Sequence, residues 1–408
     1  MTTSSEPSWR TPAVMLAAGA TLLALSLGIR HAFGLFLAPM TRDNGWTREL
    51  FALAMAVQNL VWGAAQPFAG RLADRLGAGK AILGGSLLYV AGLLLMAQAQ
   101  SPAALLSSGF VIGLGLSGTT MSVVFGAVAR STPPARRAFA MGVAMSVGSL
   151  GQFAMLPGAL WSIEAIGWAG TLLALAALGA GMVPLSGALF ERPAAPSPGE
   201  RHMTFREVIA EALAHRGFWL LSFGFFVCGF HVVFIATHLP AYLADRGLGA
   251  RTGAVVLALV GLFNIGGSFL AGWLGDRMRK PLVLVGIYAL RSVVLAAFVL
   301  APLTEGSAYA FGAAMGILWL STVPLTNGTV ASVFGVQNLS TLGGAVFFFH
   351  QVGAFLGGWL GGRLYVATGS YDVVWWLSVA LGVVAALLNL PVREEPVARL
   401  RAAEEGVA

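Results

Sequence analysis

The chain has 408 residues, of which 57% are hydrophobic and only 10% are charged. This composition excludes an ordinary soluble protein, because a water-soluble domain cannot bury so large an apolar fraction. The formal charge is +7, yet the cations lie in short loops between apolar blocks rather than on one basic face, which argues against a nucleic-acid partner.

Apolar blocks of roughly 20 or more residues follow one another along the chain, each long enough to cross about 30 Å of hydrocarbon as a helix. The first block is too long for the apolar region of a signal peptide, so we expect it to remain as the first span. We predict an all-α membrane protein with twelve transmembrane helices at 12–40, 48–70, 79–99, 103–129, 138–163, 167–190, 217–243, 251–274, 281–301, 307–331, 338–364 and 371–391.

The cations alternate between the two sides of this predicted topology. Seventeen Lys and Arg residues fall in the termini and in the loops on their side, and five fall on the other side. Since loops rich in Lys and Arg remain in the cytoplasm, we predict that both termini are cytoplasmic and that the protein lies in the cell inner membrane.

The longest polar stretch between spans separates the sixth span from the seventh and contains Pro193, Pro196 and Pro198. We interpret it as a proline-rich linker followed by a short amphipathic helix on the membrane surface. The predicted domains are an N-terminal six-helix bundle at 1–190, a cytoplasmic linker at 191–216, a C-terminal six-helix bundle at 217–391 and a cytoplasmic tail at 392–408.

One loop sequence occurs twice at equivalent helix ends. Residues 70–77 read Gly-Arg-Leu-Ala-Asp-Arg-Leu-Gly, and residues 272–279, which lie 202 positions later, read Gly-Trp-Leu-Gly-Asp-Arg-Met-Arg. The first and seventh spans match at an interval of 201 residues, pairing Gly28, Arg30 and Pro39 with Gly229, His231 and Pro240. Such repeats predict two pseudo-symmetric bundles in the same orientation, an arrangement typical of transporters.

The first of these loops resembles the characteristic loop of the major facilitator superfamily, and the resemblance covers almost the whole chain. It implies the two-bundle major facilitator fold, in which the loop carboxylate faces a helix N-terminus of the opposite bundle and gates the transport pathway. The implied gating residues are Asp74 and Asp276, with Arg75, Arg130, Arg136 and Arg277 as candidate partners. The alternative is a solvated loop charge that only sets topology.

Ionisable groups inside the predicted spans are few, and each is costly to bury in a bilayer, so each is a candidate for function. The candidates for substrate binding are Arg30, His31, His231, Arg291 and His350, with Gln152, Asn264 and Gln351 as polar companions. Arg30 and His231 occupy equivalent positions in the repeat, on helices that in this superfamily line the central cavity. We therefore expect both to face one site that takes an anion.

Several of these residues have a structural alternative. Arg30 could extend to the membrane surface, Arg291 could pair with a neighbouring helix, and His350 could be a satisfied core histidine beside three phenylalanines.

Within the superfamily the chain resembles bacterial relatives of the proton-linked monocarboxylate transporters and the oxalate/formate antiporters. The residues that carry this resemblance are Gly34-Leu35-Phe36, Gly45-Trp46-Thr47-Arg48 and His238-Leu239-Pro240-Ala241-Tyr242-Leu243. The monocarboxylate branch has an Asp four residues before an Arg on helix eight, and these positions are Asn264 and Ser268 here. The proton mechanism of that branch therefore does not carry over. A coupled proton has to be carried by the substrate, a histidine or a gating aspartate.

No phosphate-binding loop, catalytic constellation or metal-ligand cluster is present in the sequence, so we expect no enzyme, no ATP and no cofactor. The single cysteine, Cys228, forms no intramolecular disulfide. The predicted function is alternating-access transport of a small organic anion, of which a monocarboxylate is the leading candidate, by a monomer in contact with membrane lipid. Efflux of drug-like or apolar compounds and a non-transporting receptor are the alternatives.

Overall fold

The computed structural model describes residues 9–191 and 203–405, and every regular element in these two ranges is helical. The helices of the first range are α1 (Pro12–His31), η1 (Ala32–Phe36), α2 (Leu37–Asn44), α3 (Arg48–Leu76), α4 (Ala78–Ala97), α5 (Pro102–Thr119), α6 (Met121–Ser131), η2 (Pro134–Arg136), α7 (Arg137–Ala180) and α8 (Met182–Ala188). Those of the second range are α9 (Phe205–Ala214), α10 (Arg216–Asp245), α11 (Ala250–Gly275), α12 (Lys280–Leu300), α13 (Glu305–Leu318), α14 (Thr322–Phe334), α15 (Leu339–Thr368), α16 (Asp372–Asn389) and α17 (Ala398–Glu405).

Ten helical segments of the described ranges are long and apolar enough to cross a membrane. One of them, Pro134–Ala188, has 55 residues and turns back at Gly167, whose φ of 72° favours a residue without Cβ. Helix α3 is not among the ten, and it carries Gln58, Asn59 and Gln66 in its middle. The chain is therefore a multi-pass membrane protein, and the count of twelve spans stays a prediction.

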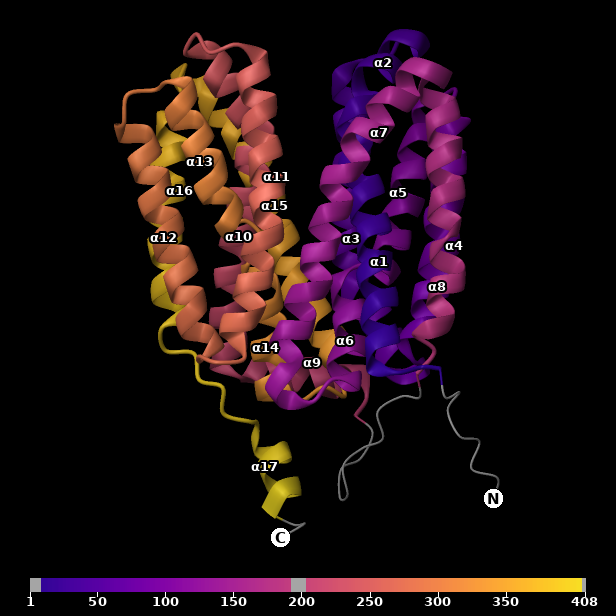
Figure 1. Ribbon diagram of the computed structural model, residues 1–408, viewed down its shortest axis with the longest axis vertical. Helices are drawn as coiled ribbons and strands as arrows, with labels where there is room; N and C mark the ends of the chain where they lie inside the picture. The colour runs from indigo at the N-terminus through magenta and orange to yellow at the C-terminus, as the bar shows by residue number, and fades with distance from the viewer. Residues whose placement is uncertain (1–8, 192–202, 406–408) are drawn as a thin grey trace.

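Two groups of helices, α1 to α8 and α10 to α16, form two bundles that lie side by side (Figure 1). They meet at the end where α1 begins and α17 lies, which we call the terminal end, and their ribbons diverge toward the opposite end, where α2 lies. Helix α3 packs against α15 and helix α7 against α11 across the two bundles.

Glycines allow this close approach between the bundles. A Cβ atom added to Gly142 of α7 would lie 2.7 Å from the Cα atom of Gly272 in α11, and one added to Gly344 of α15 would lie 2.7 Å from the carbonyl oxygen of Gln66 in α3. Small residues at helix contacts of this kind hold membrane helices together by close packing.

The short helix α9 lies at the terminal end, within the predicted linker (Figure 1). Thr204 and Glu207 cap its first turn reciprocally, because each side chain accepts a hydrogen bond from the other residue's backbone N–H.

Two membrane helices are interrupted at equivalent places in the two bundles. Helix α5 ends at Thr119 and α6 begins after the extended residue Thr120, while α13 ends at Leu318 and α14 begins after Ser321. Interrupted helices expose backbone polar groups in the middle of a membrane, which transporters use at their binding sites.

Candidate functional site

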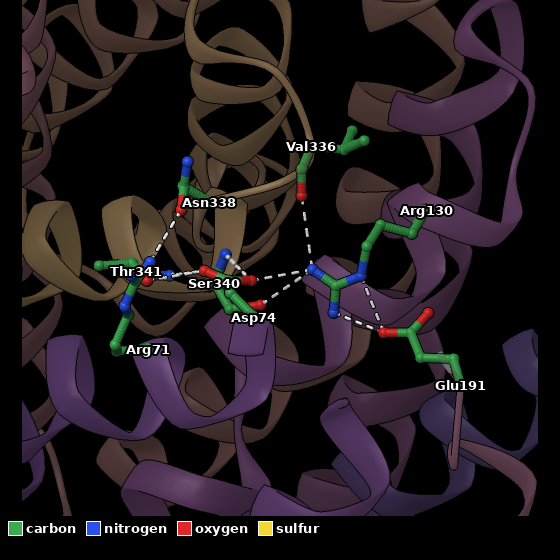
Figure 2. Close-up of polar contacts among 8 residues, drawn as sticks. All are labelled: Arg71, Asp74, Arg130, Glu191, Val336, Asn338, Ser340 and Thr341. Atoms are coloured by element: carbon green, nitrogen blue, oxygen red, sulfur yellow. Dashed lines mark hydrogen bonds and ion pairs between the residues drawn. The ribbon is translucent and has the colours of Figure 1, made fainter. Parts of the chain in front are cut away.

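The carboxylate of Asp74 joins the end of α3 to the start of α15 in the other bundle (Figure 2). Its oxygens accept hydrogen bonds from the backbone N–H of Ser340 at 3.2 Å and of Thr341 at 2.7 Å, and from the hydroxyl of Thr341 at 2.7 Å. These N–H groups belong to the first turn of α15, where the helix dipole stabilises an anion by about 0.3–1 kcal/mol, or more when buried.

Arg130 of α6 extends this contact into a buried network. Its guanidinium lies 2.9 Å from Asp74 and 2.5 Å from Glu191, and it also donates to the carbonyl of Val336 at 3.4 Å in the opposite bundle. The side chain of Arg130 is only 6% exposed. Burial raises the pKa of the Glu191 carboxyl above its ordinary value, and the ion pair with Arg130 opposes that shift.

The second loop repeats the arrangement in the other direction. Asp276, after α11, accepts hydrogen bonds from the backbone N–H of Ala138 at 2.9 Å and of Phe139 at 3.0 Å, in the first turn of α7. Burial raises the pKa of the Asp276 carboxyl, and the two N–H groups oppose the rise.

The interval of 202 residues between the two aspartates also separates Ala138 from Ser340 and Phe139 from Thr341. We call the two aspartates and these helix starts the gate. Each half of the gate joins one bundle to the other at the terminal end.

The structure assigns the role of ion-pair partner to Arg130 and not to the other predicted cations. In the part of the chain that the structure describes, Arg75 and Arg136 make no ion pair, and Arg277 donates to the carbonyl of Trp273 at 3.1 Å and stacks over its ring. Arg75 follows Asp74 directly on α3, and adjacent residues on a helix do not face one another, while Arg277 lies in the turn after α11.

Arg30 of α1 lies farther into the membrane and points toward α3. One of its terminal nitrogens donates to the side-chain oxygen of Asn59 at 2.5 Å, and its guanidinium lies 5.5 Å from the ring centre of Trp62. The Nε atom of Arg30 is buried and has no hydrogen-bond partner, and no carboxylate in the described ranges forms an ion pair with the group. The cation is thus held in place without being neutralised.

Asn59 connects this cation to the other bundle. Its backbone carbonyl accepts a hydrogen bond from the side chain of Gln351 in α15 at 3.1 Å, and Gln351 lies 3.3 Å from the ring of His350. The ring of Trp62 packs against Phe347 of the same helix at 4.9 Å. Arg30 therefore lies beside the contact between α3 and α15.

The two helix interruptions also bind residues that lie near the contacts between the bundles. Trp62 donates to the hydroxyl of Thr120 at 2.9 Å. Asn264 of α11, which is 202 residues after Trp62, accepts from the backbone N–H of Leu320 at 3.0 Å and donates to Ser149 of α7 at 2.8 Å. Each interruption is thus stabilised by an equivalent residue of the repeat, and Asn264 also links the two bundles.

Comparisons with known proteins identify this architecture. The sequence profile of the Major Facilitator Superfamily matches residues 14–358. The chain belongs to the major facilitator superfamily. Its helices also superimpose on a structure of the transporter FucP in the outward conformation, with a TM-score of 0.72 and 17% identity over 92% of this chain and 97% of that chain.

Two curated relatives align along most of their length. Human monocarboxylate transporter 11 is 27% identical over 392 residues, which are 90% of this chain and 80% of the relative. The probable sulfoacetate transporter SauU of Cupriavidus necator is 28% identical over 382 residues, which are 86% of this chain and 87% of the relative. The chain is therefore a secondary transporter of this superfamily.

The superfamily fold does not bring every predicted residue to the site around Arg30. His231 is fully buried inside the second bundle, where its Nε2 atom lies 2.8 Å from the carbonyl of Ser378 in α16. The expectation that His231 faces Arg30 is therefore wrong. The repeat fixes the height of a residue along a helix, but the neighbouring helices decide which way it points.

Arg291 is also fully buried, and it binds the carbonyls of Leu318 and Trp319 where α13 ends. A cation at a helix C-terminus stabilises carbonyls that have no partner within the helix. Arg291 is thus a structural residue of the interruption, and it does not reach the contact between the bundles.

The remaining predicted residues differ in their surroundings. His350 and Gln351 are each 7% exposed and lie at the contact between the bundles. Gln152 is half-buried, while His31 is exposed beside Arg30, and neither makes a side-chain hydrogen bond in the described ranges. In those same ranges no three His, Cys, Asp or Glu residues form a group that could hold a metal ion.

Sequence reasoning missed Trp62, Thr120 and Glu191 as members of the site. Trp62 was detectable, because it aligns with Asn264 in the 202-residue repeat. Glu191 was detectable as an acidic residue at the end of the sixth span, on the side rich in cations. Thr120 carries no comparable signal, since a hydroxyl inside a membrane helix usually bonds its own backbone.

Proposed function

We propose that this protein transports a small organic anion of the monocarboxylate class by alternating access, with Arg30 binding the carboxylate. The observation that carries the proposal is the unneutralised guanidinium of Arg30. Unlike Arg291, whose guanidinium binds backbone carbonyls at a helix end, the half-buried Arg30 lies beside the contact between the bundles with its Nε atom unpartnered, so an anion at this contact can bind it through charge-assisted hydrogen bonds.

The geometry around Arg30 suits a carboxylate with a small apolar group. Asn59 holds one terminal nitrogen at 2.5 Å and leaves the Nε edge of the guanidinium without a protein partner. A guanidinium binds a carboxylate through two parallel hydrogen bonds, which together define its orientation. The rings of Trp62 and Phe347 supply apolar surface on the same side.

The contact of Arg30 with α3 can couple anion binding to a movement of α3 relative to α15. The hydrogen bond from Gln351 to the Asn59 carbonyl, at 3.1 Å, crosses between the bundles directly behind the residue that holds Arg30. An anion that draws the guanidinium away from Asn59 changes the position of this contact. His350, next to Gln351, is the titratable group in place to carry a coupled proton.

The contacts of the gate bear on which end of the proposed pathway is closed. Asp74 and Asp276 bind the helix starts of the opposite bundle, so the bundles are joined at the terminal end. Among the described residues, the hydrogen bonds between the bundles that lie farthest from this end are Gln351 to Asn59 and Asn264 to Ser149. This arrangement supports an outward-facing state. The names of two relatives refer to monocarboxylates and to sulfoacetate, which are both organic anions.

Uptake of radiolabelled lactate into proteoliposomes tests the role of Arg30. A charge-assisted hydrogen bond contributes about 1.5–3 kcal/mol, so Arg30→Gln is expected to lower uptake by about tenfold or more. Arg30→Lys retains the charge but not the planar fork and is expected to keep part of the activity.

His31→Gln is the matched control, because it removes a neighbouring titratable group that is exposed and has no hydrogen bond. Its uptake is expected to equal that of the unmodified protein. Full uptake by Arg30→Gln would show that the anion binds elsewhere.

A further inference from the structure

A pocket lies at the terminal end, beside the Asp74 half of the gate. Its volume is about 780 Å³, and it lies between the last two turns of α3, the start of α9 and the loop between α14 and α15. The residues that line it are Phe68, Arg71, Leu72, Asp74, Arg75, Leu76, Met203, Phe205, Gln337 and Asn338.

Two arginines one helical turn apart give this pocket a positive charge. Arg71 donates to the side chain of Asn338 at 3.0 Å and to the carbonyl of Met203, but its Nε atom is buried without a partner. Arg75 is exposed and makes no ion pair or hydrogen bond within 9–191 and 203–405. The carboxylate between them, Asp74, is already bound to α15 and Arg130. Like charges four residues apart on a helix repel, and an anion between them removes that cost.

Gln337 adds a polar side chain that makes no hydrogen bond to the rest of the protein. Both atoms of its side-chain amide are buried, and neither has a hydrogen-bond partner. An unpaired buried amide costs about 1–3 kcal/mol, so its retention beside two arginines indicates a polar ligand.

The outer wall of the pocket is apolar. Phe68, Leu72 and Leu76 follow one another at four-residue spacing on α3 and are 64%, 45% and 47% exposed. The ring of Phe68 stacks on Phe205 of α9 at 5.2 Å. This apolar stripe runs beside the arginine stripe, so the pocket is charged on one side and apolar on the other.

The other half of the repeat lacks this combination. Arg277 is the equivalent of Arg75, but it stacks on Trp273 with its guanidinium 4.0 Å from the ring centre and donates to the Trp273 carbonyl. Trp273 replaces Arg71, so the corresponding pocket of about 440 Å³ has no second cation on that helix. The other cation of that pocket, Arg136, lies outside α11, and none of its lining residues has a buried polar side-chain atom without a partner, so the pair of arginines one turn apart beside an unpaired amide distinguishes the first pocket.

We propose that this pocket binds an anionic phospholipid from the leaflet at the terminal end, which the cation distribution predicts to be the cytoplasmic leaflet. The phosphate lies against Arg71, Arg75 and the Gln337 amide, and the acyl chains lie along Phe68, Leu72 and Leu76. Clusters of basic residues at this level of a membrane protein attract anionic headgroups.

The bound lipid also affects the gate. Arg71 already joins α3 to Asn338, the residue that precedes α15, and to Met203 at the start of α9. A phosphate that orders Arg71 and Arg75 stabilises the closed arrangement of these elements. The site is independent of the substrate proposed for Arg30.

Native mass spectrometry of the purified full chain tests the proposal, with phosphatidylglycerol and phosphatidylcholine of identical acyl chains as probes. We expect the unmodified protein to bind phosphatidylglycerol at least about tenfold more tightly than phosphatidylcholine. Arg75→Gln is expected to remove most of that preference, and the matched variant Arg277→Gln to retain it.

Gln337→Leu provides a second variant that leaves every arginine in place, and it is expected to weaken phosphatidylglycerol binding in the same direction. Equal binding of the two lipids, or equal loss in Arg75→Gln and Arg277→Gln, would overturn the proposal. If inorganic phosphate alone competes fully with phosphatidylglycerol, the pocket takes a soluble anion and the lipid assignment is wrong.

Discussion

The position of Arg30 depends on a hydrogen bond to an uncharged acceptor. The side-chain oxygen of Asn59 holds the guanidinium at 2.5 Å without cancelling its charge. A carboxylate at position 59 would form an internal ion pair and would compete with the substrate for the same cation.

This contact yields a prediction at the residue scale. Asn59→Asp is expected to lower lactate uptake by about tenfold or more, because the introduced carboxylate neutralises Arg30. Asn59→Ala also removes the amide but adds no charge, so it is expected to retain more uptake than Asn59→Asp. Equal uptake by the two variants in proteoliposomes would mean that the free charge of Arg30 is unimportant.

The sequence singles out Arg30 because a guanidinium in a membrane helix is costly and therefore rare, and its role in binding stays a prediction. It was insufficient for His231 and Arg291, which are equally rare but bind backbone carbonyls inside the second bundle. Membrane helices are apolar on nearly every side, so the pattern of polar residues does not specify which face points toward the pathway.

At the scale of helices, the two halves of the gate are related by the repeat but differ in strength. Asp74 accepts two backbone N–H bonds and one hydroxyl bond and pairs with Arg130, whereas Asp276 accepts the two N–H bonds. Thr341 supplies the hydroxyl, and its equivalent, Phe139, has none.

This asymmetry predicts unequal effects of neutralising the two aspartates. Asp74→Asn is expected to shift the population toward an open terminal end by about tenfold, and Asp276→Asn by a smaller factor, since each charged hydrogen bond contributes about 1.5–3 kcal/mol. Thr341→Val, which removes only the hydroxyl, is expected to have an effect smaller than that of Asp74→Asn.

Spin labels at Arg48→Cys and Arg251→Cys measure this shift, because both positions are exposed at the opposite end and lie in different bundles. A Cys228→Ser background removes the one native thiol. Opening of the terminal end is expected to shorten the distance between the labels. An Asp276→Asn variant that shortens it more than Asp74→Asn would contradict the account of the gate.

The two aspartates were predictable because their loop is repeated in the sequence at a fixed interval, and the resemblance to the major facilitator superfamily implied that they face helix starts of the opposite bundle. The predicted spans 138–163 and 338–364 already begin at these facing helix starts, but the sequence alone does not show that Ser340, Thr341, Ala138 and Phe139 donate to the aspartates. The interruptions at Thr120 and Trp319 were not predicted, because the residues at these positions are compatible with a continuous helix.

At the scale of the whole molecule, two bundles meet at the terminal end and diverge toward the other (Figure 1). The cation of Arg30 lies beside the last hydrogen bond that joins α3 to α15 before they diverge. An anion entering from the opposite end therefore reaches the cation before it reaches the gate.

Thermal unfolding of the purified protein with lactate and with lactamide tests this claim most directly, because the two compounds differ only in the charged group. A ligand at about 100 times its Kd stabilises the folded state by about 2.7 kcal/mol. Lactate is expected to raise the Tm of the unmodified protein but not that of Arg30→Gln, and lactamide is expected to raise neither. An equal rise with both compounds, or an undiminished rise with lactate in Arg30→Gln, would contradict an anion site at Arg30.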